Sequence, residues 1–253
     1  MPYIGQAPAP KVITSSDLSA DVVTEAKIAD NAVENEHLNA NVITGHTALG
    51  ATPADTDELL VSDAGTLKRV DFSYLKGGGQ KTLLLTSNFS DAASVTVNNT
   101  YITSTYRDYF FEISQAHPAT DDVGFRMTFS EDNASSFLSS NYSHMTHGIN
   151  QGGSEGSNTD ASAQYLRLHN ANYNGVGNQN NECISSFGYL FNPLSTAFNT
   201  MIMGQSMVID NSNTMYITTF GGKNSSTSAT NAIKFAFSSG NLSTGQLRFY
   251  GIT

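Results

Sequence analysis

A repeat of ten residues, from Val12 to Thr47, constrains the fold of this chain more than any other feature. In register its blocks read VITSSDLSAD, VVTEAKIADN, AVENEHLNAN and VITGHTALGA. On an α-helix, ten residues at about 100° each bring an apolar position back about 80° from its start, so the apolar row would wind around the helix. On a β-strand, side chains alternate with a period of two, so an even repeat returns each apolar position to the same side. The repeat therefore predicts extended β structure.

Such a ribbon carries apolar side chains on both sides, because neighbours such as Val22 and Val23 point in opposite directions. Each repeat is too small to form its own core, whereas several identical chains wound around a common axis can bury both sides. We interpret the stretch as the shaft of a parallel homo-oligomer, most simply a homotrimer. The alternative is a flexible or loosely helical linker whose repeats are similar by chance. The positions expected to line the shaft are Val12, Ile13, Leu18, Val22, Val23, Ile28, Val33, Leu38, Val42 and Ile43.

Aromatic residues divide the chain. Of its 14 Phe and 11 Tyr, only Tyr3, Phe72 and Tyr74 precede residue 77. A large hydrophobic core therefore belongs to the later part, which is long enough to form one. The glycines at 77–79 predict a flexible joint before that part. We expect a terminal attachment peptide at 1–11, the shaft at 12–57, a β-hairpin collar at 58–76 and a head domain at 77–253.

The collar has the pattern of a hairpin. Two β-rich runs flank the turn sequence DAG at 63–65. After the turn, Val70, Phe72 and Tyr74 occupy alternate positions. We therefore expect one side of a strand that includes these residues to be buried.

The head reads as short apolar runs separated by turn residues. Apolar and polar residues alternate most clearly at 125–129, 233–237 and 247–249. Nine or ten such runs predict an antiparallel β-sandwich with a jelly-roll-like fold. The expected strands are KTLLLT, SVTVNNTYI, DYFFEIS, VGFRMTFS, AQYLRLH, CISSFGYLFNP, MIMGQSMVID, TMYITTFGG, AIKFAFSSG and GQLRFYGI.

Two further features of the head follow from spacing and composition. The spacers 150–163 and 170–181 are long and rich in Gly, Asn and Ser, so we expect both to be surface loops. Met201, Met203 and Met207 have even spacing, which places them on one face of a strand. We expect that face to contribute to the core.

Charge and composition exclude several partners. The net charge is −10, whereas binding to a nucleic-acid backbone requires clustered Lys and Arg. No apolar run approaches the roughly 18 residues of a membrane helix, and the first residues do not resemble a signal peptide. We therefore expect no nucleic-acid partner and no membrane insertion. The single cysteine, Cys183, excludes an intrachain disulfide and a cysteine metal cage.

Patterns that could indicate catalysis or metal binding have simpler explanations. The sequence GGSEG at 152–156 matches a hydrolase nucleophile motif, but that motif needs a strand before it and a helix after it. His144 and His147 would face opposite ways on a strand, without a third ligand nearby. The acidic pairs at 121–122 and 131–132 flank a predicted strand, where carboxylates are most often solvated turn residues. We expect no catalytic residue, no metal site and no cofactor.

One cluster of residue types favours ligand binding. The second long loop and its flanks combine aromatic rings with amide groups, which suits a polar ligand or a glycan. An ordinary hydrophilic loop is the alternative explanation. The candidate ligand-binding residues are Tyr165, Asn172, Tyr173, Asn174, Gln179 and Asn180.

Several segments together resemble a known family. MPYIG, the IADNAV-type decapeptides and LLVSDAGTLKRVDFSYL are similar to the N-terminal halves of tail-fibre and other appendage proteins of marine tailed bacteriophages. The head resembles a recurring phage β-domain through STYRDYFFEIS, VGFRMTFS, NYS, FNP and FSSGNLSTGQLRFYGIT, in that order. The resemblance spans nearly the whole chain and implies a homotrimeric virion protein with an outward β-sandwich tip. It implies attachment to other virion proteins through the N-terminal residues Pro2, Tyr3, Ile4 and Gly5.

These observations favour a tail-fibre-like virion appendage that attaches to a host surface receptor, a glycan, through its head. Trimerisation would raise the avidity of individually weak sites. The alternative is a purely structural virion part, such as a head fibre, a decoration protein or a neck whisker, without a receptor. A third hypothesis, an enzyme acting on surface glycan, lacks the tandem β-helix signature of a polysaccharide-degrading spike.

Overall fold

The computed structural model describes residues 12, 14–17, 24, 27–29, 32–33, 37, 39–75 and 81–252. The chain forms two compact units, Met1–Leu75 and Lys76–Thr253. The predicted glycine joint at 77–79 lies outside the described residues. So do the predicted attachment peptide at 1–11, with Pro2, Tyr3, Ile4 and Gly5, and the shaft positions Ile13, Leu18, Val22, Val23 and Leu38.

The described residues of the repeat form short turns. Ser15–Asp17 is a 3-10 helix, η1, and Asn41–Thr44 is one turn of α-helix, α1. The carboxylate of Asp17 accepts hydrogen bonds from the backbone N–H and the hydroxyl of Thr14, at 3.0 and 2.8 Å. The Asn39 side chain accepts one from the first N–H of α1, at 2.9 Å. Such local bonds compete with strand pairing, and the prediction of extended structure is wrong at η1 and α1.

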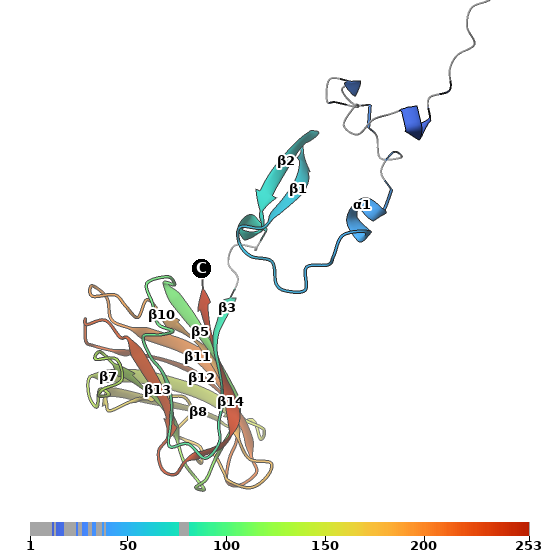
Figure 1. Cartoon of the computed structure of the whole chain (residues 1–253). Coiled ribbons are helices and arrows are strands. Elements are labelled where there is room, and N and C mark those ends of the chain that lie inside the picture. Colours follow the sequence, from blue (N-terminus) through green and yellow to red (C-terminus); the bar gives the residue numbers. More distant parts are fainter. Residues whose placement is uncertain are drawn as a thin grey trace, which may run out of the picture. The chain divides into compact units, whose positions relative to one another are not determined.

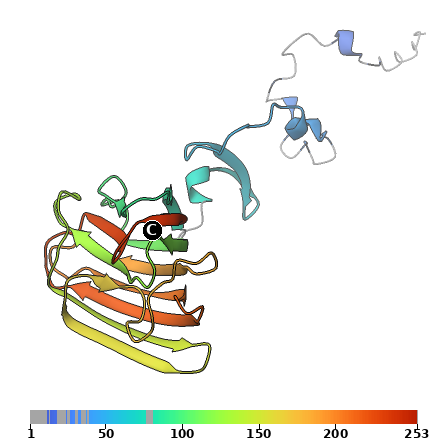
Figure 2. The ribbon, with the colours of Figure 1, turned by 90° about the horizontal axis from the view of Figure 1, so that it is seen from below.

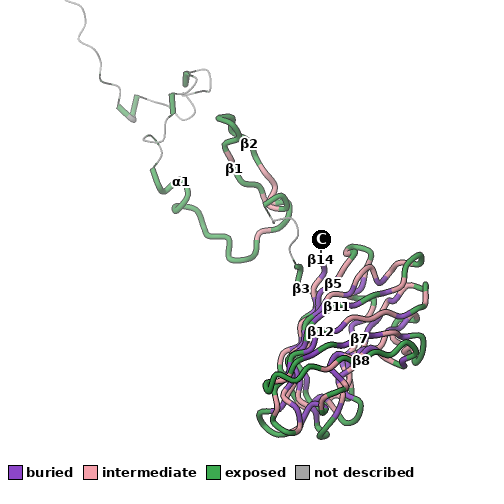
Figure 3. The backbone as a smooth tube through the Cα atoms, turned by 180° about the vertical axis from the view of Figure 1, so that it is seen from behind, coloured by how far each residue is buried: buried purple, intermediate pink, exposed green. Residues whose placement is uncertain are grey.

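The predicted shaft positions are exposed where the structure describes them. Val12 and Ile43 have 80% and 82% of their surface exposed. Ile28, Val33 and Val42 are exposed as well. Among the described residues of this unit none is buried, as the green and pink trace in Figure 3 shows. The N-terminal unit of a single chain therefore presents apolar side chains to water.

The collar hairpin is confirmed. Strand β1 (Glu58–Asp63) pairs antiparallel with β2 (Thr66–Asp71). Ala64 and Gly65, between them, have φ values of 49° and 81°, as a two-residue hairpin turn with the twist of the strands requires. The strand ends at Asp71, earlier than predicted, because Phe72–Tyr74 turns into the 3-10 helix η4. The predicted buried side is wrong for this chain alone, because Val70 and Phe72 are only half-buried and Tyr74 is 79% exposed.

The C-terminal unit consists of two antiparallel sheets, one of eight strands and one of four (Figure 1). The mainly β, antiparallel prediction is therefore confirmed. In spatial order, the larger sheet contains β3 (Lys81–Asn88), β14 (Leu242–Ile252), β5 (Asp108–Pro118), β10 (Ile184–Phe191), β11 (Met201–Ile209), β12 (Met215–Asn224), β7 (Tyr142–Asn150) and β8 (Glu155–Ala163). The smaller sheet contains β4 (Val95–Val97), β13 (Ala232–Phe237), β6 (Phe125–Ser130) and β9 (Leu166–Arg167).

The two sheets share one hydrophobic core. The rings of Phe111 on β5 and Phe235 on β13 have centroids 5.1 Å apart, and thus join the sheets. The hydroxyl of Tyr142 on β7 accepts a hydrogen bond from the N–H of Phe129 on β6, at 2.7 Å. The alternating positions predicted to be buried are confirmed, namely Phe125, Met127, Phe129, Ile233, Phe235, Phe237, Leu247 and Phe249.

The prediction of two surface loops is wrong in part. Residues 155–163 form β8, which lies at one edge of the larger sheet, opposite the edge formed by β3 (Figure 2). The sequence of this edge strand is polar and mainly exposed, so it lacks the alternation of apolar and polar residues that would have predicted a strand. The second spacer is a loop, but Asn170 and Val176 are fully buried. Val176 forms bridges to Val123 and Asp210, so part of this loop is built into the unit.

The methionines of β11 share a face, as predicted, but the prediction that this face belongs to the core is wrong. Met201, Met203 and Met207 are 48%, 54% and 47% exposed. The inward positions of β11 are Ile202, Gly204, Ser206 and Val208. Gly204 can face inward because the ring of Phe220 on the neighbouring strand occupies the space that a side chain at this position would need.

Adding one methyl group at β11 tests this packing. A Cβ at Gly204 would collide with the Phe187 carbonyl oxygen and lie 2.6 Å from Cζ of Phe220. A Cβ at the outward Gly221 would have its nearest neighbour, the Ile202 carbonyl oxygen, at 3.8 Å. We expect Gly204→Ala to lower the free energy of unfolding by about 1–3 kcal/mol. The matched variant Gly221→Ala should change it by no more than about 0.5 kcal/mol. Urea denaturation measures both, and equal effects would contradict the assignment of faces.

Candidate ligand-binding site

Two of the six predicted ligand-binding residues line the same pocket. Tyr165 and Tyr173 face a cavity of about 230 Å³. Asn172 instead donates a hydrogen bond to the Ser157 carbonyl at 2.6 Å, and Asn174 donates one to the Ser212 hydroxyl at 2.9 Å. Gln179 and Asn180 are exposed and do not line this cavity. The structure thus brings together the predicted aromatic residues but not the predicted amides.

The cavity is lined by residues of β6 and β9 and of the adjoining loops at 122–124 and 169–175, and we call it the arginine pocket. The residues of its wall that matter here are Asp122, Arg126, Tyr165, Arg167, His169 and Tyr173. Arg126 on β6 and Arg167 on β9 are direct register partners across the two strands. Their neighbours Phe125, Met127, Leu166 and Leu168 are fully buried, so the alternation of the strands turns both arginines outward.

Both arginines surround the ring of Tyr165. The guanidinium carbon of Arg126 lies 4.6 Å from the ring centroid and that of Arg167 lies 5.7 Å from it. One terminal nitrogen of Arg167 donates a hydrogen bond to the Tyr165 hydroxyl at 3.3 Å. The Nε atoms of both arginines are buried and have no hydrogen-bond partner in the described part of the chain. The four N–H donors on the terminal nitrogens of each guanidinium outnumber the two bonds that Arg167 makes to Tyr165 and His169, so these nitrogens, rather than the buried Nε atoms, keep donor capacity for a further group.

His169 forms the inner wall and is electrically neutral. Burial, and then the nearby charge of Arg167, lower its pKa to about 3. Its Nε2 lies 3.3 Å from a terminal nitrogen of Arg167, which can only donate, so Nε2 accepts. Its Nδ1 therefore carries the proton and faces the Tyr216 hydroxyl at 3.5 Å.

The loop over the pocket is held by hydrogen bonds from several elements. Tyr216 donates to the Asn174 carbonyl at 3.1 Å, and its ring centroid lies 4.7 Å from that of Tyr173. The Tyr173 hydroxyl lies 2.9 Å from the Gly148 carbonyl oxygen. The carboxylate of Asp122 accepts the N–H of Gly175 at 2.7 Å. These hydrogen bonds preorganise the wall of the pocket in the absence of a ligand.

A second surface lies on the outer side of the larger sheet. We call it the methionine face, which consists of Met145, Ile149, Phe187, Met201, Met203, Met207, Met215 and Ile217, all exposed. Gly221 lies between Met203 and Met145 in the strand register, at the floor of a groove of about 620 Å³. Contiguous apolar surface of this kind is typical of protein interfaces.

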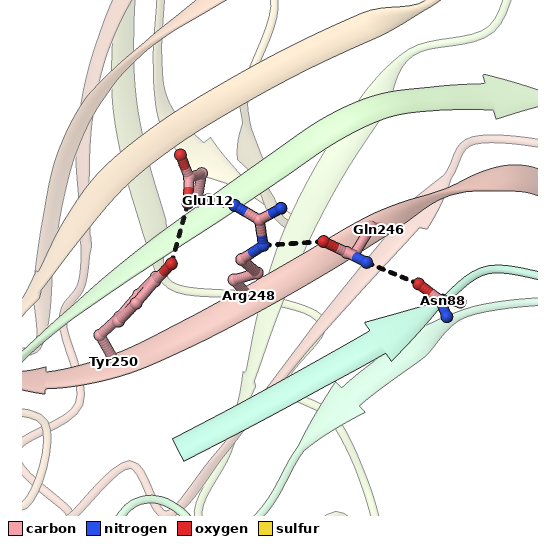
Figure 4. Close-up of polar contacts among 5 residues, drawn as sticks. All are labelled: Asn88, Glu112, Gln246, Arg248 and Tyr250. Carbon is pink, nitrogen blue, oxygen red and sulfur yellow. Dashed lines mark hydrogen bonds and ion pairs between the residues drawn. The ribbon is translucent and has the colours of Figure 1, made fainter. Parts of the chain in front are cut away.

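Towards the β3 edge, the same outer side becomes polar (Figure 4). Gln246 donates to Asn88 at 2.7 Å and accepts from the Nε of Arg248 at 2.8 Å. Arg248 also pairs with Glu112 at 3.6 Å, and Glu112 accepts a hydrogen bond from Tyr250 at 3.1 Å. These side chains satisfy one another, so they offer less to a ligand than the arginine pocket does.

The patterns set aside in the sequence have ordinary structural roles. His144 is buried and His147 is exposed, which confirms that they face opposite ways. The GGSEG segment leads into strand β8 rather than into a helix. The Asp132 carboxylate accepts hydrogen bonds from Ser136 and Ser130, which lower its pKa to about 2. A low pKa opposes a role as general acid.

Sequence reasoning did not identify the two arginines, Asp122 or His169 as parts of a site. One signal was available, because Arg126 and Arg167 are outward positions of strands without acidic residues, in a chain with 12 Lys and Arg against 22 Asp and Glu. Their pairing was not accessible, because it depends on the register between strands far apart in the sequence.

Within the described residues, no group of three or more His, Cys, Asp and Glu side chains could hold a metal ion. None of the helices in the described part of the chain has the length and apolar character needed to cross a membrane. Comparison with models of protein families, with curated proteins and with solved structures gives no match.

Lowering the pH tests the neutral state of His169. The pKa of His169 is about 3 when folded against 6.5 for the ordinary group, so the unfolded chain binds the extra proton between these values. The stability from neutral His169 is therefore complete above pH 6.5 and is lost as the pH falls. The slope should reach about 1.4 kcal/mol per pH unit. Burial also lowers the pKa of His144, which adds to the slope.

We expect His169→Gln to flatten this slope between about pH 6.5 and 4.5, above the range in which most carboxylates titrate. The matched variant His147→Gln removes an exposed histidine and should leave the slope as it is. Urea denaturation at several pH values measures the free energy of unfolding. An unchanged slope in His169→Gln would contradict a neutral His169.

Proposed function

We propose that this chain is a non-enzymatic attachment protein, a homotrimeric, tail-fibre-like appendage of a tailed bacteriophage virion. In this proposal the N-terminal residues dock on other virion proteins, and the repeat forms the shaft. The C-terminal unit, a jelly-roll-like β-sandwich, binds a polar receptor of the host surface, a glycan. The arginine pocket is the observation that carries the proposal, because its wall combines the aromatic rings of Tyr165 and Tyr173 with the guanidinium groups of Arg126 and Arg167.

The position of the pocket within the C-terminal unit supports a role in receptor binding, because a receptor site is expected at the end remote from the strand that follows the N-terminal unit in the sequence. Lys81, at the start of β3, pairs with Ile252, while Asn88, at its end, pairs with Gln246. Following the register across the larger sheet places the turn between β11 and β12 at the Asn88 end. Asn211 in that turn donates to the Gly175 carbonyl of the pocket loop at 3.3 Å. The pocket therefore lies at the end of the unit remote from the start of β3.

Exposed apolar side chains in both units support the homotrimer. The N-terminal unit exposes Val12, Val42 and Ile43, and the C-terminal unit exposes the methionine face. A monomer would leave all of these side chains in water, whereas association of identical chains can bury them. Three copies would also present three pockets, so each could bind weakly and still give firm attachment.

Mass measurement tests the assembly. We expect the soluble full chain to have three times the monomer mass of 27.0 kDa. Ile43→Asp places a charge at an 82% exposed apolar position and should shift the mass toward the monomer. Thr47→Asp, at an exposed polar position of the same stretch, should leave the trimer intact. A chain that stays monomeric at high concentration would contradict the proposal.

Binding to host cells tests the attachment role. We expect the purified protein to bind intact host cells and Tyr165→Ala to weaken that binding with the oligomer intact. Tyr74→Ala removes an exposed tyrosine of the other unit and serves as the control. An oligomer without any cell binding would instead favour a structural head fibre, decoration protein or neck whisker. Turnover of host polysaccharide would contradict the non-enzymatic assignment.

A further inference from the structure

The two arginines of the pocket are placed where like charges repel. Arg126 and Arg167 are directly opposite each other on adjacent strands and on the same face. Like charges in this arrangement destabilise a sheet. A chain with 22 acidic residues could easily supply a carboxylate between them. The arrangement is therefore costly unless a negative group from outside the chain completes it.

Two other arginines of the described residues have carboxylate partners. Arg248 pairs with Glu112 at 3.6 Å, and Arg69 pairs with Glu58 at 2.9 Å. Among the residues that the structure describes, neither Arg126 nor Arg167 has a carboxylate within 4.0 Å. The two pocket arginines thus differ from both of these surface arginines, which already have a partner.

The lining of the pocket carries a net positive charge although the whole chain is negative. Strands β4, β6, β9 and β13 of the smaller sheet contain Arg126, Arg167 and Lys234 and no acidic residue. The inner wall, His169, is neutral at ordinary pH because burial disfavours its charged form. Asp122 is the one acidic residue of the pocket wall, and it already accepts a hydrogen bond from Gly175. Two arginines against one aspartate leave a net positive charge.

We propose that the arginine pocket binds an acidic sugar, with the carboxylate of the sugar held between Arg126 and Arg167. A guanidinium group is planar and presents paired N–H donors that match the oxygens of a carboxylate. Tyr165 and Tyr173 line the same cavity, and the ring surface that they leave open there suits the apolar face of a sugar ring. The cavity of about 230 Å³ is smaller than the usual pocket of a drug-sized ligand, so one sugar residue is the expected occupant.

The choice of a sugar rests on the proposed attachment function, whereas the anion site rests on the arginines alone. The probes are sodium glucuronate, neutral glucose as its matched control, and sodium sulfate as an anion without a sugar. Ligand-observed NMR titration of the full chain at constant ionic strength measures their dissociation constants. We expect glucuronate to bind about tenfold or more tightly than glucose. Equal binding of the two would overturn the anion site. Sulfate binding as tight as that of glucuronate would overturn the sugar.

Variants assign the binding to the pocket. Arg126→Gln and Arg167→Gln should each weaken glucuronate binding by about tenfold or more. Arg107→Gln removes the same charge from an exposed arginine outside the pocket and should leave it unchanged. Asp122→Asn keeps an acceptor for Gly175 but removes the negative charge, so it should tighten binding several-fold. Equal loss in Arg107→Gln and Arg126→Gln would show a diffuse charge effect and overturn the site.

The stability of the variants gives a second readout. Because Arg126→Gln relieves repulsion, its thermal midpoint without ligand should equal or exceed that of the natural chain. Glucuronate should raise the midpoint of the natural chain but not that of the variant. If Arg126→Gln does not fold, Arg126→Lys keeps the charge but loses the planar donor pair, and glucuronate should still bind it more weakly. Unchanged binding by a folded Arg126→Lys would then overturn the proposal.

The two proposals can fail separately. Glucuronate binding without any binding to host cells would overturn the attachment function and leave the anion site standing. Host-cell binding that survives Arg126→Gln in full would overturn the role of the pocket and leave the attachment function standing.

Discussion

The packing of Phe111 against Phe235 is the contact on which the rest of the C-terminal unit depends. These two rings, 5.1 Å apart, join the larger sheet to the smaller one at the centre of a single core. Phe111 also stacks with Phe220 of its own sheet, and Phe235 with Phe125. Once these rings point inward, strand alternation sends Arg126 outward on one sheet and Met203 outward on the other. The positions of both candidate surfaces are therefore consequences of the core.

The sequence predicted which residues share a face more reliably than which face is buried. The runs with Phe at alternate positions, such as Phe125 and Phe129, were assigned to the core correctly. Exposing several large aromatic rings to water would cost more free energy than exposing the polar residues between them. On β11 the methionines alternate with Ile202, Gly204, Ser206 and Val208, so the apolar residues of the two faces are similar in number. On β11, the packing of Phe220 against Gly204 and the hydrogen bond from the Ser206 hydroxyl to the Leu168 carbonyl, at 2.6 Å, determine which face is buried. Phe220 lies on the next strand, β12, whereas Leu168 comes more than thirty residues before β11.

The candidate site was predictable only in its aromatic part. Tyr165 and Tyr173 stood out through their composition, and the fold places them on one wall. Asn172 and Asn174 instead tie the loop to Ser157 on β8 and to Ser212 in the turn after β11, and Gln179 and Asn180 are exposed outside the pocket. Arg126 and Arg167 meet only because β9 pairs with β6. In the N-terminal unit, a repeat that suits a strand becomes turns where the structure describes it, because Asp17 and Asn39 bond their own neighbourhood.

The pairing of β3 along its whole length with β14 also has a mechanical consequence. The strand starts beside Ile252 and ends beside Gln246, and the arginine pocket lies towards the latter end. A pull between Lys81 and a molecule held in the pocket would cross the strands from β14 to β12 and would also have a component along β3. The component along β3 loads the hydrogen bonds between β3 and β14 in shear, so they must break together instead of opening one after another. The pairing of β3 with β14 thus favours resistance to that component of the force from a tethered object.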